Sequence, residues 1–199
     1  MKKIFFMMAM ASVMAISCTK DGDDKKDNGD DKTPTEQVSR VFDDFEDGIV
    51  TWNPGFSASF DVVDNPSKTG INTSAKVGKI THKGAQWEWL WRTPFGQEAD
   101  GTAEVEYVTF SEEGYVVKVD VLSPKAGSTI YLKFEASSAE AIEIQNVKTT
   151  KANEWETLEY DYEPYSPVDG EYLKFTICFA DTTTENEATY VDNIRICQE

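Results

Sequence analysis

Apolar and polar residues alternate along much of the chain with a period of two. Successive side chains of a β-strand point to opposite faces, so this period predicts strands with one buried face rather than helices. Turn-forming sequences such as Asn53-Pro54-Gly55 and Ser123-Pro124 separate the runs. The alternation is clearest over residues 117–121, 130–135, 158–162, 174–179 and 194–197. The pattern predicts an all-β sandwich.

Residues 35–199 are expected to form this sandwich as a single domain, because no internal repeat and no second pattern interrupts them. One segment, 136–147, leaves two alternatives open. It is long enough for a short helix, yet Ile142 and Ile144 alternate with polar residues as they would in a strand.

The N-terminus has the features of a secretory signal. Two lysines precede the apolar run Ile4–Ala15, which is too short for a membrane-spanning helix of about 20 residues. Next comes Ala15-Ile16-Ser17-Cys18, which resembles a bacterial lipobox, in which the cysteine is acylated and becomes the first residue of the mature chain. We therefore predict a lipoprotein signal peptide over residues 1–17 and a lipid on Cys18. The alternative is ordinary signal cleavage near the same place.

Residues 18–34 form an acidic segment almost without apolar side chains. Such a segment cannot bury enough surface to offset the entropy of ordering, so we predict a disordered linker. An acidic run behind a lipidated cysteine also resembles the surface-export signal of some Gram-negative lipoproteins, and a plain solvated spacer is the alternative. Together with the lipid, this segment predicts a protein anchored in the outer membrane, at the cell surface or facing the periplasm.

Composition excludes several kinds of function. The 199 residues carry 36 Asp and Glu against 19 Lys and Arg, which gives a net charge of −17. Lysines and aspartates balance over residues 1–34, so the acidity belongs to the predicted sandwich. Nucleic acid is not an expected partner, since its phosphates require clustered Lys and Arg. A single histidine and three cysteines rule out a histidine metal cluster, a disulfide scaffold and a four-cysteine zinc site.

The two cysteines of the predicted sandwich would meet an oxidising compartment, where a disulfide between them could form. If segments 173–180 and 190–197 pair directly as a hairpin, Cys178 lies opposite Asp192 and Cys197 opposite Leu173. A disulfide needs Cα atoms within about 7 Å of each other, and this register does not supply that. We therefore expect free thiols.

Several short motifs occur in an order that resembles jelly-roll carbohydrate-binding modules with a galactose-binding-like fold. They are Phe45-Glu46-Asp47-Gly48, Gly70-Ile71-Asn72-Thr73-Ser74, Tyr131-Leu132-Lys133-Phe134-Glu135, Trp155-Glu156-Thr157-Leu158 and Tyr190-Val191-Asp192-Asn193-Ile194. The resemblance spans about residues 42–197. It implies a sandwich that binds a polysaccharide or oligosaccharide, either attached to a degrading enzyme or alone in a surface lipoprotein. The N-terminal features match the second arrangement.

The segment Trp87-Glu88-Trp89-Leu90-Trp91 places three indoles on one face of a strand and charged neighbours, Glu88 and Arg92, on the other. Burying those charges unpaired is costly, so the alternation favours at least two buried tryptophans. We expect Trp89 to be buried, Trp87 to be exposed beside Lys133, and Trp91 to lie near an edge. A β-bulge would turn one ring outward.

Exposed indoles of this kind offer a platform on which sugar rings stack. The candidate contacts are therefore Trp87, Trp89 and Trp91, with His82, Glu88 and Lys133 as partners for sugar hydroxyls. In the resembled modules, a tryptophan near Trp87 and a lysine near Lys133 lie on or beside the ligand-facing sheet. Core packing is the alternative for the indoles, and it is the expectation for Trp52 and Trp155.

The resemblance also implies a structural calcium ion. By position, Glu46 and Asp192 match the side-chain ligands of the resembled modules, and Asp47 is a further candidate. Calcium takes six to eight oxygen ligands, including carboxylates and backbone carbonyls. The alternative is that Asp192 caps a turn and Glu46 is solvated.

These observations predict a lipid-anchored, non-catalytic glycan-binding module. One alternative is an accessory subunit of a surface glycan-uptake complex, which would contact a protein partner through its tryptophans. A jelly-roll glycosidase or polysaccharide lyase is not expected. Glu104-Val105-Glu106 lacks the third acid of a laminarinase-type strand, and only three arginines are available to bind a uronate.

Overall fold

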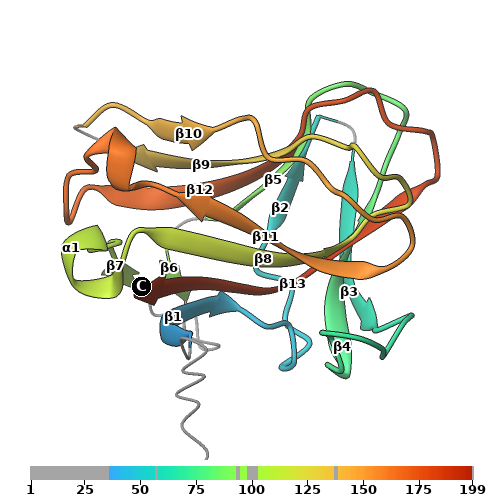
Figure 1. Ribbon diagram of the computed structural model, residues 1–199, viewed down its shortest axis with the longest axis horizontal. Helices are drawn as coiled ribbons and strands as arrows, with labels where there is room; N and C mark the ends of the chain where they lie inside the picture. Colours follow the sequence, from blue (N-terminus) through green and yellow to red (C-terminus); the bar gives the residue numbers. More distant parts are fainter. Residues whose placement is uncertain (1–35, 57, 93–94, 98–102, 137–138, 199) are drawn as a thin grey trace, which may run out of the picture. The chain divides into compact units, whose positions relative to one another are not determined.

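Two antiparallel β-sheets pack face to face around an aromatic core (Figure 1). The computed structural model describes residues 36–198 except for residues 57, 93–94, 98–102 and 137–138. The predicted signal peptide, Cys18 with its predicted lipid and the acidic linker lie outside the described residues. None of the helices within the described part is long and apolar enough to cross a membrane.

The first sheet has the strand order β11-β8-β13-β4-β3, with β1 paired to β13 as well. Its strands are β1 (Gln37–Asp43), β3 (Ser59–Asp64), β4 (Lys76–Thr81), β8 (Val116–Leu122), β11 (Trp155–Asp161) and β13 (Ala188–Gln198). The second sheet, called sheet B below, has the order β10-β9-β12-β5-β2. Its strands are β2 (Asn53–Gly55), β5 (Glu88–Arg92), β9 (Ile130–Ala136), β10 (Ile142–Ile144) and β12 (Tyr172–Phe179).

Three smaller elements complete the described chain. A separate hairpin pairs β6 (Phe95–Gln97) with β7 (Ala103–Glu106). A single-turn helix, α1 (Phe110–Glu113), and a 3-10 turn, η1 (Glu163–Tyr165), lie in the connections.

The order of the strands is that of a jelly roll, as the sequence predicts. From β8 onwards the chain crosses repeatedly between the sheets: β9 and β10 lie in sheet B, β11 in the first sheet, β12 in sheet B and β13 in the first sheet. The undecided segment 136–147 contributes the strand β10 among its described residues. The direct hairpin of β12 with β13, from which the cysteine register was worked out, does not form, because the two strands belong to different sheets. Both Cys178 and Cys197 are nevertheless free thiols, as expected.

Aromatic side chains from both sheets fill the core. Phe134 and Phe175 stack with ring centroids 4.6 Å apart, and the ring of Tyr162 meets Phe134 edge-on at 5.2 Å. Two tyrosines donate hydrogen bonds across the core, Tyr160 from β11 and Tyr162 from just after it. The Tyr160 hydroxyl binds the Ile130 carbonyl at 2.8 Å, and the Tyr162 hydroxyl binds the Leu132 carbonyl at 3.1 Å. These bonds satisfy buried hydroxyls and fix β9 of sheet B relative to the opposite layer.

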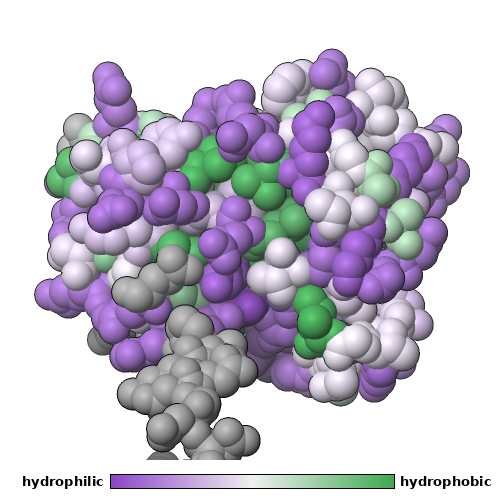
Figure 2. Space-filling view, viewed as in Figure 1, coloured by the Kyte–Doolittle hydropathy of each residue, from purple (hydrophilic) through white to green (hydrophobic). Residues whose placement is uncertain are grey.

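The outer surface is mainly hydrophilic in the view of Figure 2, with hydrophobic side chains gathered near its centre, where Figure 1 shows β9, β11 and β12. The edge strands of the two sheets on this side are β10 and β11. The aromatic residues considered next belong instead to the outer face of sheet B.

Candidate functional site

Sheet B turns a row of aromatic side chains away from the core. In β5, Leu90 is fully buried, whereas Trp89 and Trp91 have the opposite parity and are only partly buried. The expectation that Trp89 is buried in the core is therefore wrong. Trp87, just before the strand, is 44% exposed, as expected. We call the outward-facing rings of Phe56, Trp87, Trp89, Trp91 and Tyr131 the aromatic face.

The tryptophans point outward because their charged neighbours find partners inside. The Glu88 carboxylate is fully buried, and its oxygens accept hydrogen bonds from the Lys83 backbone N–H at 2.7 Å and the Thr183 hydroxyl at 3.0 Å. The Arg92 guanidinium donates to the Phe42 carbonyl at 2.6 Å and to Asp43 Oδ2 at 3.0 Å. Arg92 is paired with Asp43, and the Glu88 carboxylate is satisfied by hydrogen bonds, so the cost that argued for inward indoles is largely offset.

His82 also contacts Glu88 within the sandwich. Its Nδ1 lies 2.6 Å from Glu88 Oε2 and its Nε2 lies 2.9 Å from Thr189 Oγ1. Burial lowers the pKa of His82 below its usual value, with the neighbouring Glu88 acting in the opposite direction. The ring is thus neutral, donating from Nδ1 and accepting the Thr189 hydroxyl at Nε2. His82 and Glu88 thus lie on the inner side of sheet B, whereas the tryptophans lie on its outer side, so these two residues do not share a site with the indoles.

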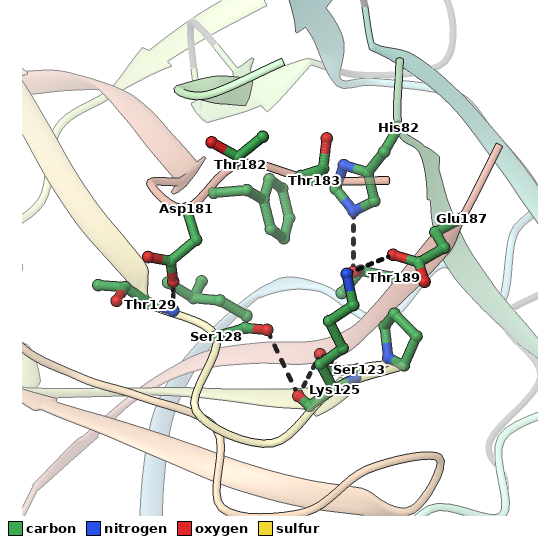
Figure 3. Close-up of a pocket in the computed structure, with 13 residues that line it drawn as sticks. His82, Ser123, Lys125, Ser128, Thr129, Asp181, Thr182, Thr183, Glu187 and Thr189 are labelled. Carbon is green, nitrogen blue, oxygen red and sulfur yellow. Dashed lines mark hydrogen bonds and ion pairs between the residues drawn. The ribbon is translucent and has the colours of Figure 1, made fainter. Parts of the chain in front are cut away.

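A small cavity lies beside His82 at one end of the sandwich (Figure 3). It is walled by hydroxyl side chains and by an ion pair of 3.0 Å between Lys125 and Glu187. Asp181 Oδ2 accepts the Thr129 backbone N–H at its rim. The volume is about 40 Å³, room for a few water molecules at about 10–15 Å³ each but not for a sugar ring. The aromatic face is therefore the better candidate for a glycan site.

Cross-strand register arranges the outer face of sheet B in two rows. One row runs Gly55, Trp89, Cys178 and Tyr131 across β2, β5, β12 and β9. The next row runs Asn53, Trp91, Thr176, Lys133 and Glu143 across all five strands. Trp87 contacts Tyr131 edge-on, with centroids 6.0 Å apart. Lys133 therefore lies in the row of Trp91 and not beside Trp87.

Phe56 belongs to the same face, and the sequence pattern gives no indication of it. Its ring is 58% exposed and stacks on Trp89 with centroids 5.6 Å apart and planes inclined by 24°. Gly55 makes room for the indole, because a Cβ there would lie only 2.0 Å from Trp89 Nε1. A glycine before an aromatic residue at a strand end is the only sequence signal, and it is weak.

The two most exposed residues of the aromatic face, Phe56 and Trp87, both have strained backbone. Phe56 has φ of 52° and Trp87 has φ of 65°, in the left-handed region that bulky side chains rarely adopt. Each such residue costs on the order of 1 kcal/mol or more and persists where the surrounding structure holds it. The buried Phe45 has the same conformation (φ 56°), so the backbone alone does not mark a ligand site. What favours a binding role is that Phe56 and Trp87 combine it with exposure on one face.

Polar groups accompany the aromatic rings. Lys174 Nζ lies 5.4 Å from the centroid of the Trp91 ring, within the range of a cation–π contact. Burial raises the pKa of the Cys178 thiol to about 11, so the thiol stays protonated under Trp89 and Tyr131. The face thus combines flat apolar rings with a few hydrogen-bonding groups, the composition typical of small-ligand sites.

The candidate calcium ligands converge only in part. Glu46 Oε1 accepts the Ala75 backbone N–H at 2.6 Å, and Asp192 Oδ2 accepts Asn72 Nδ2 at 2.7 Å, so both carboxylates reach the segment 72–76. Asp47 instead binds the Ile49 N–H in an exposed local turn. Among the described residues, no three Asp, Glu, His or Cys side chains cluster as metal ligands. Amide and carbonyl oxygens would have to complete a calcium site here.

Two further tryptophans have the structural role expected of them. Trp52 and Trp155 are both 2% exposed. The Trp52 Nε1–H donates to Asp43 Oδ2 at 2.8 Å, and that of Trp155 donates to the Ser67 carbonyl at 2.9 Å. They anchor the ends of strands and leave the aromatic face to the other indoles.

No protein-family model and no curated protein sequence matches the chain. Solved structures match its fold. The CBM22-2 xylan-binding domain from Paenibacillus barcinonensis has a TM-score of 0.51 at 15% identity, over 79% of this chain and 98% of that domain. A CBM61 module in complex with β-1,4-galactotriose has a TM-score of 0.51 at 16% identity, over 80% of this chain and 99% of the module.

An exo-β-agarase has a TM-score of 0.58 at 15% identity, and the match covers 81% of this chain but only 25% of the enzyme. The chain is thus similar to one part of that protein. The chain has the jelly-roll, galactose-binding-like fold of carbohydrate-binding modules.

Proposed function

We propose that this protein is a non-catalytic glycan-binding module that stacks sugar rings on the aromatic face of sheet B. The observation that carries the proposal is the exposure of two rings of the aromatic face: Phe56, which stacks on Trp89, and Trp87, which contacts Tyr131. The buried Phe45 has the same left-handed backbone as these two residues, so it is the exposure of Phe56 and Trp87 on one face that supports a binding role. The fold is compatible with such a role but does not by itself assign it.

The aromatic face suits a carbohydrate because pyranose rings expose flat C–H surfaces beside hydroxyl groups. Indole and phenyl rings supply the complementary apolar area, and Lys133 and Thr176 lie in the adjacent row to meet hydroxyls. We further propose that Cys18 carries a lipid and holds this module at the outer membrane, with residues 18–34 as the spacer that lets it reach its ligand.

A glycan panel tests the binding proposal. Purified Thr35–Glu199, which forms one unit by its internal contacts, is titrated calorimetrically with xylan, β-glucan, galactan and agarose oligosaccharides. Binding to at least one with a Kd between about 1 μM and 1 mM is expected. The absence of binding to every glycan, with the protein folded, would contradict the proposal and would favour the alternative of a protein-contacting accessory subunit.

Calcium, as a second component of the proposal, would be held by Glu46 and Asp192 together with oxygens of the segment 72–76. Burial raises the pKa of Asp192 to about 6, although hydrogen bonds from Asn72, Ser74 and Asn193 act in the opposite direction. A bound cation would offset the cost of burying its ionised form. The role of the ion would be to stabilise the loop between β3 and β4 against β13.

A further inference from the structure

A single carboxylate on the aromatic face binds both lysines that the described strands of sheet B place there. Glu135 Oε1 lies 3.1 Å from Lys133 Nζ, and Glu135 Oε2 lies 2.5 Å from Lys174 Nζ. Burial alone would raise the pKa of Glu135, but the hydrogen bonds from Lys174 and Lys133 outweigh it and lower that pKa. The three groups therefore form an ionised bridge that spans β9 and β12.

The bridge lies against the centre of the aromatic face. Lys174 extends over the Trp91 ring, and Lys133 is opposite Thr176, which is itself opposite Trp91. The Thr176 residue is 8% exposed, and its Oγ1 has no hydrogen-bond partner among the described residues. A buried hydroxyl without a partner costs free energy, and a ligand that supplies one recovers it.

A bound acidic sugar would need a free cation on this face. Its carboxylate loses hydration when the sugar stacks on the rings, and that loss must be offset by an opposite charge. Glu135 binds both lysines, so an acidic sugar would have to displace Glu135 from their ammonium groups although the bridge itself has a net charge of +1. The net charge of −17 on the chain also repels anions from a distance. A neutral hydroxyl group needs only a hydrogen-bond partner, which Thr176 can provide.

We infer that Glu135 is a specificity-determining residue, which makes the aromatic face bind uncharged glycans and reject uronate-bearing ones by holding Lys133 and Lys174. This inference rests on the proposed function, because it concerns the ligand of the same site. Rejection of the wrong ligand by an unfavourable charge is a common source of specificity.

The test compares neutral oligosaccharides of xylose, glucose and galactose with oligogalacturonate and glucuronate-bearing xylo-oligosaccharide, by calorimetry at low ionic strength. Wild-type protein is expected to bind at least one neutral ligand and to bind every acidic one more weakly. Glu135→Gln keeps the shape of the side chain and frees both lysines. It should improve binding of an acidic ligand about tenfold relative to the neutral one, because the freed lysines can donate charge-assisted hydrogen bonds to the ligand carboxylate.

Glu143→Gln is the matched control. It removes one negative charge from the same face, but Glu143 accepts a hydrogen bond from Gln145 and is not part of the lysine bridge. This variant should leave the ratio of acidic to neutral binding near that of the wild type. A second variant, Thr176→Val, removes the hydroxyl at constant shape and should weaken neutral binding about fivefold to tenfold, as expected for one lost hydrogen bond.

The outcomes separate the two claims. Two results would overturn the role of Glu135 but leave the proposal of a glycan-binding module intact. One is a wild-type protein that binds acidic ligands more tightly than neutral ones. The other is a ratio of acidic to neutral binding that changes equally in Glu135→Gln and Glu143→Gln. A wild-type protein that binds no ligand of either kind would overturn the proposed function and this inference with it.

Discussion

Phe56 stacks on Trp89 across the junction of β2 and β5, with ring centroids 5.6 Å apart. The contact depends on Gly55, which lies opposite Trp89 in the register and leaves space for its indole. An aromatic pair of this kind contributes about 0.5–1.5 kcal/mol beyond its buried area. The pair fixes the two rings relative to each other at the β2 edge of sheet B and leaves the Phe56 ring exposed to a ligand.

Gly55→Ala should disrupt this arrangement. The added methyl would lie 2.0 Å from Trp89 Nε1, so the indole must move, and we expect a loss of about 1–3 kcal/mol in the free energy of unfolding. Chemical denaturation measures the loss. In a Trp89→Ala background the same substitution should cost almost nothing, and an equal cost in both backgrounds would show that the indole is not what Gly55 accommodates.

His82 predicts how stability varies with pH. Its pKa is lowered in the folded protein by burial, so below pH 6.5 the unfolded chain binds a proton that the folded protein does not. The stabilisation from neutral His82 is complete above its unfolded pKa of about 6.5 and is lost as the pH falls towards the folded pKa. The free energy of unfolding of wild type and of His82→Gln is measured by chemical denaturation at several pH values between 5 and 8. Plotted against pH, the wild-type free energy should fall more steeply below pH 6.5 than that of the variant. Equal pH dependence of the two proteins would contradict the assignment of a neutral ring.

Cys18 predicts where the protein is found. If this cysteine is acylated, wild-type protein fractionates with membranes, whereas Cys18→Ser should be released, because the apolar run Ile4–Ala15 is too short to anchor the chain. Immunoblots of membrane and soluble fractions provide the measurement. Retention of the variant in membranes would mean that the lipid attachment is wrong.

Calcium should raise the melting temperature if Glu46 and Asp192 bind it. A ligand specific to the folded state stabilises that state by RT ln(1 + [L]/Kd), about 2.7 kcal/mol at a hundredfold excess over Kd. Melting is compared with added calcium and with chelator. Asp192→Ala should lose the response and Asp47→Ala should keep it, since Asp47 lies in a separate turn. Identical wild-type curves under the two conditions would exclude the site.

The sequence predicts the layers of this molecule better than its pairings. Period-two alternation correctly locates β8, β9, β11, β12 and β13, because burial of one strand face is a local property of the chain. It does not show that β12 and β13 lie in different sheets, since that depends on connections across the sandwich. A hairpin was the natural local assumption, and the jelly-roll topology overrides it.

The orientation of the tryptophans was beyond local reasoning for a similar cause. Each of the two inward charges has a partner from a distant part of the chain: Asp43 is 49 residues from Arg92, and Thr183 is 95 residues from Glu88. The sequence alone does not show those partners, and burying Glu88 and Arg92 without partners would cost more free energy than burying the indoles. Phe56 could not be found either, because its role arises from a left-handed backbone and a cross-strand stack that leave no periodic trace.

The aromatic face is tested most directly by removing its exposed rings one at a time and measuring glycan affinity. Trp87→Ala and Phe56→Ala should each weaken binding by about tenfold or more, since stacking of a ring on an aromatic side chain contributes about 1–3 kcal/mol where it has been measured for bases. Tyr165→Ala is the control, because that ring is 47% exposed in η1, outside the aromatic face. Calorimetric titration of the best glycan, with circular dichroism to verify folding, is predicted to show loss of affinity in the first two variants and none in the third. Unchanged affinity in both Trp87→Ala and Phe56→Ala would contradict the account.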